Sequence, residues 1–322
     1  MSVKGELLQI LTENQGQEIS GQELADRLGV SRTAVWKAIN GLIAEGCEIQ
    51  AGRNRGYRLV GGDLLDLGAV RAFLPPELQE KEMILLKTVD STNTYAKKLA
   101  ADGAEDGTVV IAEQQTAGRG RRGNSFYSPP KSGLYMTVIL RPERHAADTD
   151  LFTVCAGCAV CRAVEQLSGT KPLIKWVNDV YLNGKKICGI LSEATSDFES
   201  GTVDSVVTGI GINISTDDFP DGLGSKAGSI CGSLGTGSVT RARLAAAVLK
   251  ELMYCLERRR SDNIADYRAR SLVLGKEVSF MLNNVRYNGK AVDIDDSGQL
   301  VVELGGETVK LNSGEVSVTV DN

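Results

Sequence analysis

The sequence predicts a multidomain α+β protein, and three observations support this fold class. Residues 1–62 combine three helical segments with two short strands, the pattern of a winged helix-turn-helix domain. Residues 63–272 mix longer helical and strand patterns, as expected for a central mixed α/β domain. Residues 273–322 contain short strands separated by turn residues, which predicts a small β-barrel.

Composition excludes several classes of protein. The 322 residues carry a net charge of −5 and are 42% hydrophobic and 24% charged, as in an ordinary globular protein. No stretch approaches about 20 continuous apolar residues, so we expect no membrane span. Seven scattered cysteines and the lack of a signal-peptide core predict a cytoplasmic location. Because the net charge is negative, any binding to DNA must use a local basic patch.

The elements of the first domain are predicted from spacing and capping residues. Apolar residues with helical spacing predict a helix over 3–13. Ser20 begins a capping box that opens a second helix. Ser31 opens a third helix over 32–45, and two short strands flank 52–56. Three helices followed by a wing predict a DNA-binding module.

The third helix and the wing carry excess positive charge. Between residues 31 and 58, five arginine or lysine residues stand against two glutamates. Basic side chains there would meet phosphates while the helix enters the major groove. The candidate DNA-binding residues are Ser31, Arg32, Thr33, Lys37, Arg53 and Arg55. Trp36 has the helical spacing of a core residue, although it could reach DNA. A winged fold used only for protein contacts is the alternative.

The remaining elements follow from periodicity. Helical patterns cover residues 66–73, 92–102, 149–167 and 240–260. Strand patterns cover residues 83–89, 108–113, 134–140, 173–175, 179–183, 187–195 and 203–213. After Val273, turn residues separate short strands at 283–284, 288–289, 296–298 and 305–306.

The loop 118–123, Gly-Arg-Gly-Arg-Arg-Gly, is the strongest single indication of a ligand. Its glycines let the backbone curl, and each guanidinium fits a phosphate or carboxylate. We therefore expect an anion-binding loop that becomes ordered around its ligand. The string also matches the dinucleotide-binding fingerprint, but that motif must open a helix. Pro129 and Pro130 follow too closely for a helix, so the Rossmann interpretation fails.

Cys155, Cys158 and Cys161 resemble the start of an iron–sulfur motif. The next expected cysteine is absent, because residue 165 is Glu. The three thiols lie at the spacing of one helical face, so we interpret them as packed, apolar side chains. His145 is the only histidine, which excludes nucleophiles activated by histidine and most zinc sites.

Several motifs resemble one family when taken in order. They are the segment 90–94 (Asp-Ser-Thr-Asn-Thr), the arginine loop, 175–179 (Lys-Trp-Val-Asn-Asp), 185–191 and 208–213. This series resembles the bacterial biotin protein ligases, over essentially the whole chain. It is most similar to the long class, which has an N-terminal DNA-binding domain and represses the biotin operon.

The resemblance implies a class II synthetase-like central domain and an SH3-like C-terminal barrel. It also implies an ATP-dependent ligase that forms biotinyl-5′-AMP and pyrophosphate, with Mg²⁺ as the accompanying ion. Biotin would then pass to a lysine of the biotin carboxyl carrier protein of acetyl-CoA carboxylase. The adenylate would also act as corepressor, giving a homodimer that binds operator DNA.

The first step joins a carboxylate to a phosphate, two anions that repel, so catalysis must rest on positioning and charge neutralisation. The resemblance implies that Ser91, Thr92, Asn93 and Gln115 line the biotin pocket and bind its ureido ring. It implies that the loop of Arg119, Gly120 and Arg121 closes over biotin and the adenylate phosphate.

Further roles follow for the nucleotide side of the site. Lys186 would reach the biotin carboxylate and a phosphoryl oxygen, so it is a candidate catalytic residue together with Arg121 and Asp179. Asn178 and Asp179 would lie beside the adenylate, where a carboxylate could position Mg²⁺ or accept a proton, although Asn-Asp also favours turns. The remaining positions, expected to let the backbone approach the nucleotide, are Gly209, Gly211 and Asn213.

The chain departs from the family pattern at a few positions. Val177 stands where proline is usual, and Phe126 stands where tryptophan is common. The segment 219–230 resembles an adenosine-covering loop but is rich in glycine. Three interpretations remain open: a ligase that is also a repressor, a ligase without regulation, and a repressor without catalysis. Lys186 and the complete arginine loop argue against the third.

Overall fold

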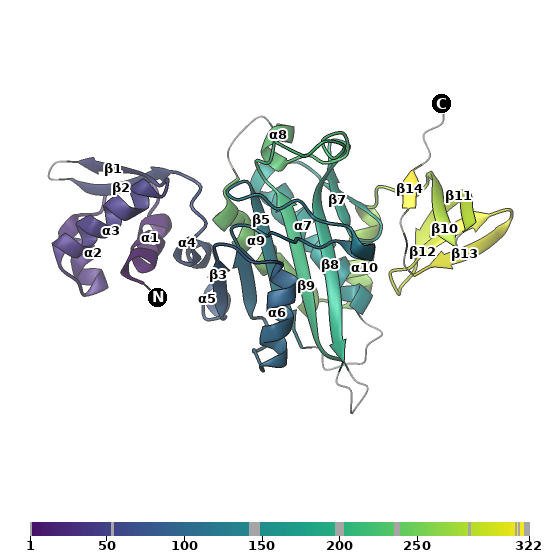
Figure 1. The fold of residues 1–322 in the computed structure, drawn as a ribbon, viewed down its shortest axis with the longest axis horizontal. Helices are drawn as coiled ribbons and strands as arrows, with labels where there is room; N and C mark the ends of the chain where they lie inside the picture. The colour runs from purple at the N-terminus through teal and green to yellow at the C-terminus, as the bar shows by residue number, and fades with distance from the viewer. Residues whose placement is uncertain are drawn as a thin grey trace.

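The computed structural model describes residues 2–52, 55–141, 149–196, 203–234, 239–282, 285–312, 314 and 316–318. Three units follow one another along the long axis, with the N-terminal helices at one end and a small β-sheet at the other (Figure 1). The expectations placed on Arg53, His145 and the turn at 283–284 lie outside the described residues.

The N-terminal unit contains three helices and a two-stranded antiparallel wing. Its elements are α1 (Val3–Glu13), α2 (Gly21–Leu28), α3 (Arg32–Ala44), β1 (Glu48–Gly52) and β2 (Gly56–Gly61). The Ser20 and Ser31 hydroxyls accept hydrogen bonds from Glu23 N at 3.1 Å and Ala34 N at 3.2 Å. These caps satisfy orphan amides and explain why α2 and α3 begin where they do. The predicted elements are confirmed.

The exposure of Trp36 contradicts the interpretation of this residue as part of the core. The buried face of α3 is formed by Val35, Ile39 and Leu42, at the spacing expected for one helical stripe. Trp36 lies one position round the helix from Val35, and 57% of its surface is exposed. The expectation was wrong because three aliphatic residues already complete the core-facing stripe.

The central unit is built on a seven-stranded sheet of order β3-β4-β5-β9-β8-β7-β6. Only β3 and β4 pair in parallel, and all other neighbours are antiparallel. The strands are β3 (Met83–Leu86), β4 (Val109–Ala112), β5 (Gly133–Leu140), β6 (Leu173–Lys175), β7 (Asp179–Leu182), β8 (Lys185–Ser196) and β9 (Val203–Asn213). The predicted strands are confirmed, apart from shifts of a few residues at their ends.

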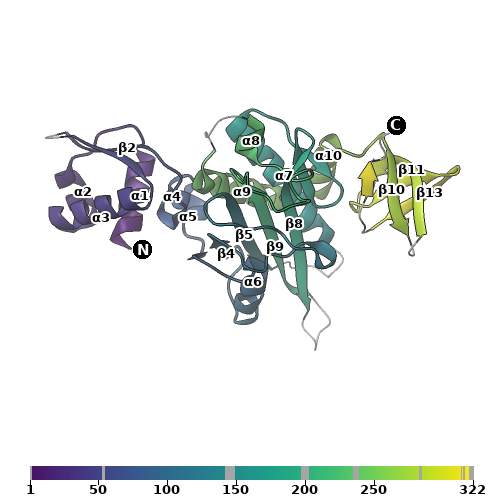
Figure 2. The same cartoon turned by 45° about the horizontal axis from the view of Figure 1, so that its top comes forward.

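Helices cover both faces of this sheet, as Figures 1 and 2 show. The helices are α4 (Leu67–Ala72), α5 (Pro76–Gln79), α6 (Thr92–Ala101), α7 (Thr149–Ser168), α8 (Ile230–Leu234), α9 (Arg241–Glu257) and α10 (Arg260–Ala269). Val110, Ile139 and Val207 pack with α6, whereas the neighbouring strand residues join the larger core beside α7 and α9. This alternation arises because successive strand side chains point to opposite faces.

Three of these helices, α5, α8 and α10, were not predicted as such, and α5, with only four residues, is too short to show a helical period. The helical pattern over 240–260 ends at Glu257, and α10 begins separately after an extended Arg259. The short helix α8 lies in a segment without clear periodicity. Neither α8 nor α10 has a strong apolar stripe of its own, so periodicity gave too little signal.

The three cysteines of α7 are buried, as predicted. Burial raises the pKa of the Cys161 thiol to about 12 and those of Cys155 and Cys158 well above their usual range. These thiols are therefore neutral at physiological pH and pack as apolar groups. Among the described residues, no group of three or more side chains could hold a metal ion.

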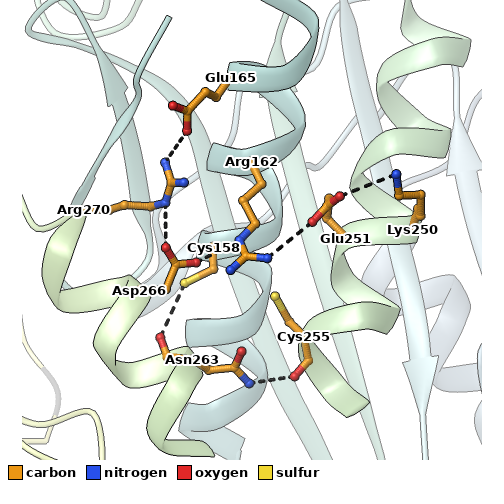
Figure 3. A network of polar contacts seen from close by, with 9 residues as sticks. All are labelled: Cys158, Arg162, Glu165, Lys250, Glu251, Cys255, Asn263, Asp266 and Arg270. Atoms are coloured by element: carbon orange, nitrogen blue, oxygen red, sulfur yellow. Dashed lines mark hydrogen bonds and ion pairs between the residues drawn. The ribbon is translucent and has the colours of Figure 1, made fainter. Parts of the chain in front are cut away.

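Polar contacts tie α7 to α9 and α10 (Figure 3). Arg162 pairs with Asp266 at 2.9 Å and with Glu251 at 3.7 Å. Asp266 also pairs with Arg270 at 3.1 Å, and the Cys158 thiol donates to the Asn263 carbonyl at 3.8 Å. These contacts fix the helical layer on which one face of the sheet rests.

The composition of α7 also bears on the expectation of no membrane span. Among the described residues, one segment, Asp150–Ser168 of α7, is long and apolar enough to cross a membrane by composition. Within the molecule 67% of that window is buried, and the core helix of a soluble protein meets the same criteria.

The C-terminal unit is a five-stranded antiparallel sheet of order β13-β12-β11-β10-β14. Its strands are β10 (Glu277–Leu282), β11 (Val285–Ile294), β12 (Leu300–Leu304), β13 (Glu307–Leu311) and β14 (Val316–Val318). Trp176 Nε1 donates to the Gly298 carbonyl at 3.0 Å, which joins this sheet to the central unit. The predicted fold class is confirmed, with a C-terminal unit made of β-strands.

Candidate functional site

A cationic cavity of about 150 Å³ lies where the arginine loop meets β6, β7 and β8. Its described lining has five cationic side chains and a single carboxylate, that of Asp179. The cations are Arg119, Arg121, Arg122, Lys175 and Lys186. Gly314 and Val316 of the C-terminal unit complete the wall. This excess of positive charge in a concave site favours an anionic ligand.

The arginine loop forms a tight turn over the cavity. Gly120 N donates to the Asn124 carbonyl at 2.7 Å, and Arg121–Gly123 forms a single 3₁₀ turn. Arg122 has φ of 56°, the left-handed region that ordinary side chains rarely adopt. The turn places three arginines on one loop, with the Arg119 side chain half exposed and 3.7 Å from Glu193.

Lys186 and Asp179 meet on neighbouring strands. Lys186 Nζ lies 2.7 Å from Asp179 Oδ1, in a charge contact without the alignment of a hydrogen bond. Antiparallel pairing of β7 with β8 brings them together. Asn178 Nδ2 donates to the Ile190 carbonyl at 3.0 Å, which fixes the turn before β7. The resulting pair could hold a carboxylate and a phosphate beside the arginine loop.

The segment 219–230 packs along the same edge. Lys186 N donates to the Lys226 carbonyl and Gly228 N donates to the Lys186 carbonyl, both at 2.9 Å. Asn213 Nδ2 donates to the Gly228 carbonyl at 3.1 Å, so Asn213 anchors this segment. Asn213 Oδ1 is buried without a protein partner among the described residues, and Asn213 lines neither pocket of the site, so its place here is behind the 219–230 segment.

A second, narrower pocket of about 20 Å³ adjoins the cationic cavity. Thr92 donates to Gln115 Oε1 from both N and Oγ1, at 2.9 and 3.0 Å. Ser91 precedes α6, but its hydroxyl does not cap the helix. A buried serine hydroxyl that is not used for capping is available to a ligand. The residues expected around biotin line this pocket together with Gly209 and Gly211, which the sequence had assigned to the nucleotide; the former are Ser91, Thr92, Asn93, Gln115 and Arg119.

Asn93 is held by the protein itself. Its Nδ2 donates to the Leu191 carbonyl at 3.0 Å and to Glu193 Oε2 at 2.9 Å, while Oδ1 accepts from Thr137 at 2.8 Å. Burial alone would raise the pKa of Glu193, but hydrogen bonds from Lys97 and Asn93 outweigh it and lower that pKa. Glu193 therefore stays ionised and orients both side chains.

Gly209 and Gly211 give space to side chains of the pocket. A Cβ on Gly209 would lie 2.1 Å from Asn93 Oδ1, and one on Gly211 would lie 2.6 Å from the Phe126 ring. Both positions therefore need glycine because side chains of the protein itself lie against them. The sequence analysis had instead expected a nucleotide to approach the backbone there. Phe126 keeps the expected apolar contact and packs edge-on against Tyr135, with ring centroids 6.4 Å apart.

Sequence reasoning left several residues in or beside the two pockets without a role. Lys175 and Arg122 stand inside quoted motifs, so the motifs already contained their signal. Glu193 had no local signal, because its partner Asn93 lies 100 residues away. The peptide between Trp176 and Val177 is cis, at the position where the sequence departs from proline.

The N-terminal unit has a separate groove of about 650 Å³ between α2, α3 and the wing. Arg32, Thr33 and Trp36 line it from α3, and Tyr57 lines it from the wing. Tyr57 pairs with Ile19 through backbone hydrogen bonds of 2.8 and 2.9 Å, which fixes the wing against α2. Lys37 and Arg55 are also exposed, whereas Ser31 acts as the cap of α3.

Comparison with known families agrees with this arrangement. Residues 85–213 match the biotin/lipoate A/B protein ligase family, residues 5–58 match an HTH domain, and residues 273–318 match the biotin protein ligase C-terminal domain. A bifunctional ligase/repressor BirA from Bacillus spizizenii is 35% identical over 98% of this chain and 99% of its own length. The chain belongs to the family of bifunctional biotin ligase/repressors.

Further relatives support the family assignment. A biotin–acetyl-CoA-carboxylase ligase from Mycobacterium tuberculosis is 35% identical over 73% of this chain and 88% of its own length. The biotin protein ligase from Aquifex aeolicus, solved in complex with biotin and ATP, superimposes with a TM-score of 0.65 and 28% identity. That match covers 75% of this chain and all of the Aquifex chain.

Proposed function

We propose that this chain is a biotin protein ligase that also represses transcription. It uses biotin and ATP to form biotinyl-5′-AMP, then transfers biotin to a lysine of the biotin carboxyl carrier protein of acetyl-CoA carboxylase. The observation that carries the proposal is the pairing of a cationic cavity with a polar pocket, both lined by Arg119 and Phe126. Biotin has a neutral ureido ring, which suits the polar pocket, and an anionic carboxylate, which suits the cationic cavity.

The proposed roles follow from position in the site. Ser91, Thr92 and Gln115 bind the ureido ring through short hydrogen bonds, while Asn93 holds the pocket wall. The narrow pocket has room for about one water molecule, so biotin entry requires side chains such as Phe126 to move. Arg119 and Arg121 neutralise the carboxylate and the α-phosphate, and Gly120 lets the loop close.

Lys186 is the proposed shared cation. From β8 it can bridge the biotin carboxylate and a phosphoryl oxygen as negative charge develops on attack. Ligand binding would separate it from Asp179, which then lies free to accept a proton from the incoming lysine of the carrier protein. Asn178 and Asn213 hold the turn and the 219–230 segment around the nucleotide.

Mg²⁺ fits this site only as an ion held largely by the ATP phosphates. The described residues offer a single carboxylate, Asp179, in the cavity and no cluster of three ligands. Mg²⁺ commonly binds one or two carboxylates together with substrate phosphates and water. When bound, it would neutralise phosphate charge, and Asp179 would be its only carboxylate contact among the described residues.

The regulatory half of the proposal rests on the N-terminal groove. We place the domain boundaries after residues 62 and 272, in the segments that follow β2 and precede β10. Ordering of the arginine loop and the 219–230 segment around the adenylate would create a surface for homodimer formation. The dimer would present two winged helices to a two-fold operator in the cytoplasm.

The deciding experiment combines catalysis with regulation. The purified protein is incubated with biotin, labelled ATP and apo-carrier domain, and labelled adenylate and biotinylated carrier are followed. Sedimentation with and without biotin and ATP then measures dimer formation, and a duplex selected from random DNA measures binding. If no adenylate forms, the ligase proposal is wrong. DNA binding that is equal without biotin and ATP would contradict the corepressor role.

A further inference from the structure

The junction between the N-terminal unit and the central sheet is organised around Arg241. This arginine is the first residue of α9, and only 3% of its surface is exposed. Its Nε donates to Asp63 Oδ2 at 2.9 Å, its Nη2 to the Asp63 carbonyl at 2.6 Å, and its backbone N to Asp63 Oδ1 at 2.7 Å. Its Nη1 pairs with the Glu113 carboxylate.

The two acidic partners belong to different parts of the molecule. Asp63 lies in the segment that leaves the wing, two residues after β2 ends at Gly61. Glu113 follows β4, and its Oε1 also accepts from Lys131 N at 3.1 Å. Arg241 therefore connects the exit of the winged helix to the central sheet. Because a buried guanidinium is stable only when its donors are paired, this contact fixes a geometry.

The rest of the junction is formed mainly by α4, whose buried residues Ala69 and Val70 belong to the same core as Leu8 of α1. α4 packs against both α1 and α9, and a Cβ on Gly68 would lie 2.0 Å from the Gly5 carbonyl oxygen. Arg243 lies over the Phe73 ring at 5.8 Å. A crevice of about 50 Å³ remains between Leu8 and Leu59 of the N-terminal unit and residues at the start of α9. Interfaces between domains of one chain commonly permit relative motion unless specific contacts oppose it, and the Arg241 network is such a contact beside this crevice.

We propose that Arg241 is a positioning residue that holds the winged helix in one orientation on the ligase domain. This inference rests on the proposed repressor function for its purpose. In a dimer, two recognition helices must match the spacing of two half-sites. A fixed orientation raises the effective concentration of the second helix once the first is bound, whereas a loose linker lowers it.

Asp63→Ala tests the proposal, because it removes both carboxylate contacts of the linker while Arg241 keeps Glu113 and the backbone carbonyl of residue 63. Asp204→Ala is the matched control, since Asp204 pairs with Arg141 at 3.0 Å on the same unit, outside the junction. Three quantities are measured on the full chain: adenylate formation, ¹⁵N relaxation of the winged-helix amides, and affinity for a duplex selected by wild-type protein with biotin and ATP. Asp63→Asn, which keeps one acceptor, serves as the conservative variant.

We expect Asp63→Ala to keep adenylate formation within about twofold of wild type and to weaken duplex binding at least tenfold. In this variant, ¹⁵N relaxation should show that the winged helix tumbles faster than the central sheet. Asp63→Asn should give a duplex affinity and a winged-helix tumbling time between those of wild type and Asp63→Ala. If the winged helix and the central sheet of Asp63→Ala have the same tumbling time, the proposal is wrong. Equal losses of synthesis and binding, which indicate general destabilisation, would also overturn it. If wild-type protein selects no duplex, the repressor function fails, and the relaxation data still decide whether Arg241 fixes the orientation.

Discussion

The cavity of the central unit and the α3 surface beside the groove of the N-terminal unit both carry positive charge, but they hold it differently. In the cavity, Lys186 is paired with Asp179 and Arg119 lies near Glu193. On α3, Arg32 in the groove and Lys37 outside it are exposed and form no ion pair among the described residues. Facing carboxylates position these two cations of the cavity, and Lys186 also lies on a strand, whereas an exposed helix surface carries the second set of charges.

This difference in how the charges are held determines which kind of ligand each site can bind. Charges that are fixed before the ligand arrives stabilise one small anion in one pose, as a reaction step requires. Solvated charges on long side chains suit a polyanion, where binding releases counterions and depends on salt. Substitutions in the cavity should therefore change rates at every salt concentration, and those on the α3 surface should change a salt-dependent affinity.

Lys186→Ala should have the largest effect. Without the shared cation, the carboxylate and the phosphate repel, so we expect adenylate formation to slow by about 10²–10³-fold. Stability should change little, because Lys186 is partly exposed. Pyrophosphate release with biotin and ATP measures the effect, and Lys185→Ala, on an exposed neighbour, is the control. Near-normal release would show that Lys186 is not catalytic.

Gly209→Ala should disturb the biotin side of the site. The new Cβ would lie 2.1 Å from Asn93 Oδ1, so Asn93 must move and lose hydrogen bonds. Misplacement by about 1 Å can cost about 100-fold, and we expect the KM for biotin to rise by about 10–100-fold. Gly41→Ala, where the nearest atom is 3.9 Å away, is the control. An unchanged KM would show that the pocket does not depend on Asn93.

Arg121→Ala should affect retention of the adenylate more than its formation. Loss of one charge-assisted contact to a phosphate costs about 1.5–3 kcal/mol, or about 10–100-fold in the dissociation rate. Stopped-flow dissociation of biotinyl-5′-AMP measures this rate. Arg259→Ala, whose side chain is largely exposed, should leave it unchanged. If both variants behave like wild type, the loop does not hold the phosphate.

Lys37→Ala should have a modest effect that depends on salt. Removing one phosphate contact should lower the slope of log affinity against log salt by about 0.9 and weaken binding several-fold at low salt. A titration of the selected duplex over a range of salt concentrations measures both. Lys4→Ala is the control, because Lys4 lies on α1 and pairs with Glu45. A slope equal to that of wild type would exclude Lys37 from the DNA surface.

Local patterns made most of the fold predictable. Caps at Ser20 and Ser31 and the aliphatic stripe of α3 act within a few residues, so spacing alone placed the helices. The arginine loop was recognisable because glycine and arginine together have few structural uses. Asn178 and Lys186 were found because their motifs resemble those of the biotin protein ligases, and the pairing of β7 with β8 brings the two motifs together.

The sequence failed where contacts span large separations. Glu193 reaches Asn93 across 100 residues, and Arg241 reaches Asp63 across 178, so no local pattern indicates either pair. Trp36 was misplaced for a different reason. Its hydrophobicity suggested burial, but the stripe of α3 was already filled by smaller residues, and only the packed helix reveals that.

Glu193→Gln should have the smallest effect, and it tests how firmly the cavity charges are fixed. The folded pKa of Glu193 is lowered, because hydrogen bonds from Lys97 and Asn93 outweigh desolvation. Its contribution to stability is therefore fully present above its ordinary pKa and is lost as pH falls through the lowered folded value. We expect Glu193→Gln to lose about 1 kcal/mol near neutral pH. Urea unfolding from pH 7 down to pH 3 should show the difference from wild type shrinking. The control is Glu307→Gln, on an exposed edge strand, which should follow wild type throughout. A difference that stays constant over this range would mean that Glu193 contributes by shape and not by charge, and that the cavity is less preorganised than its geometry indicates.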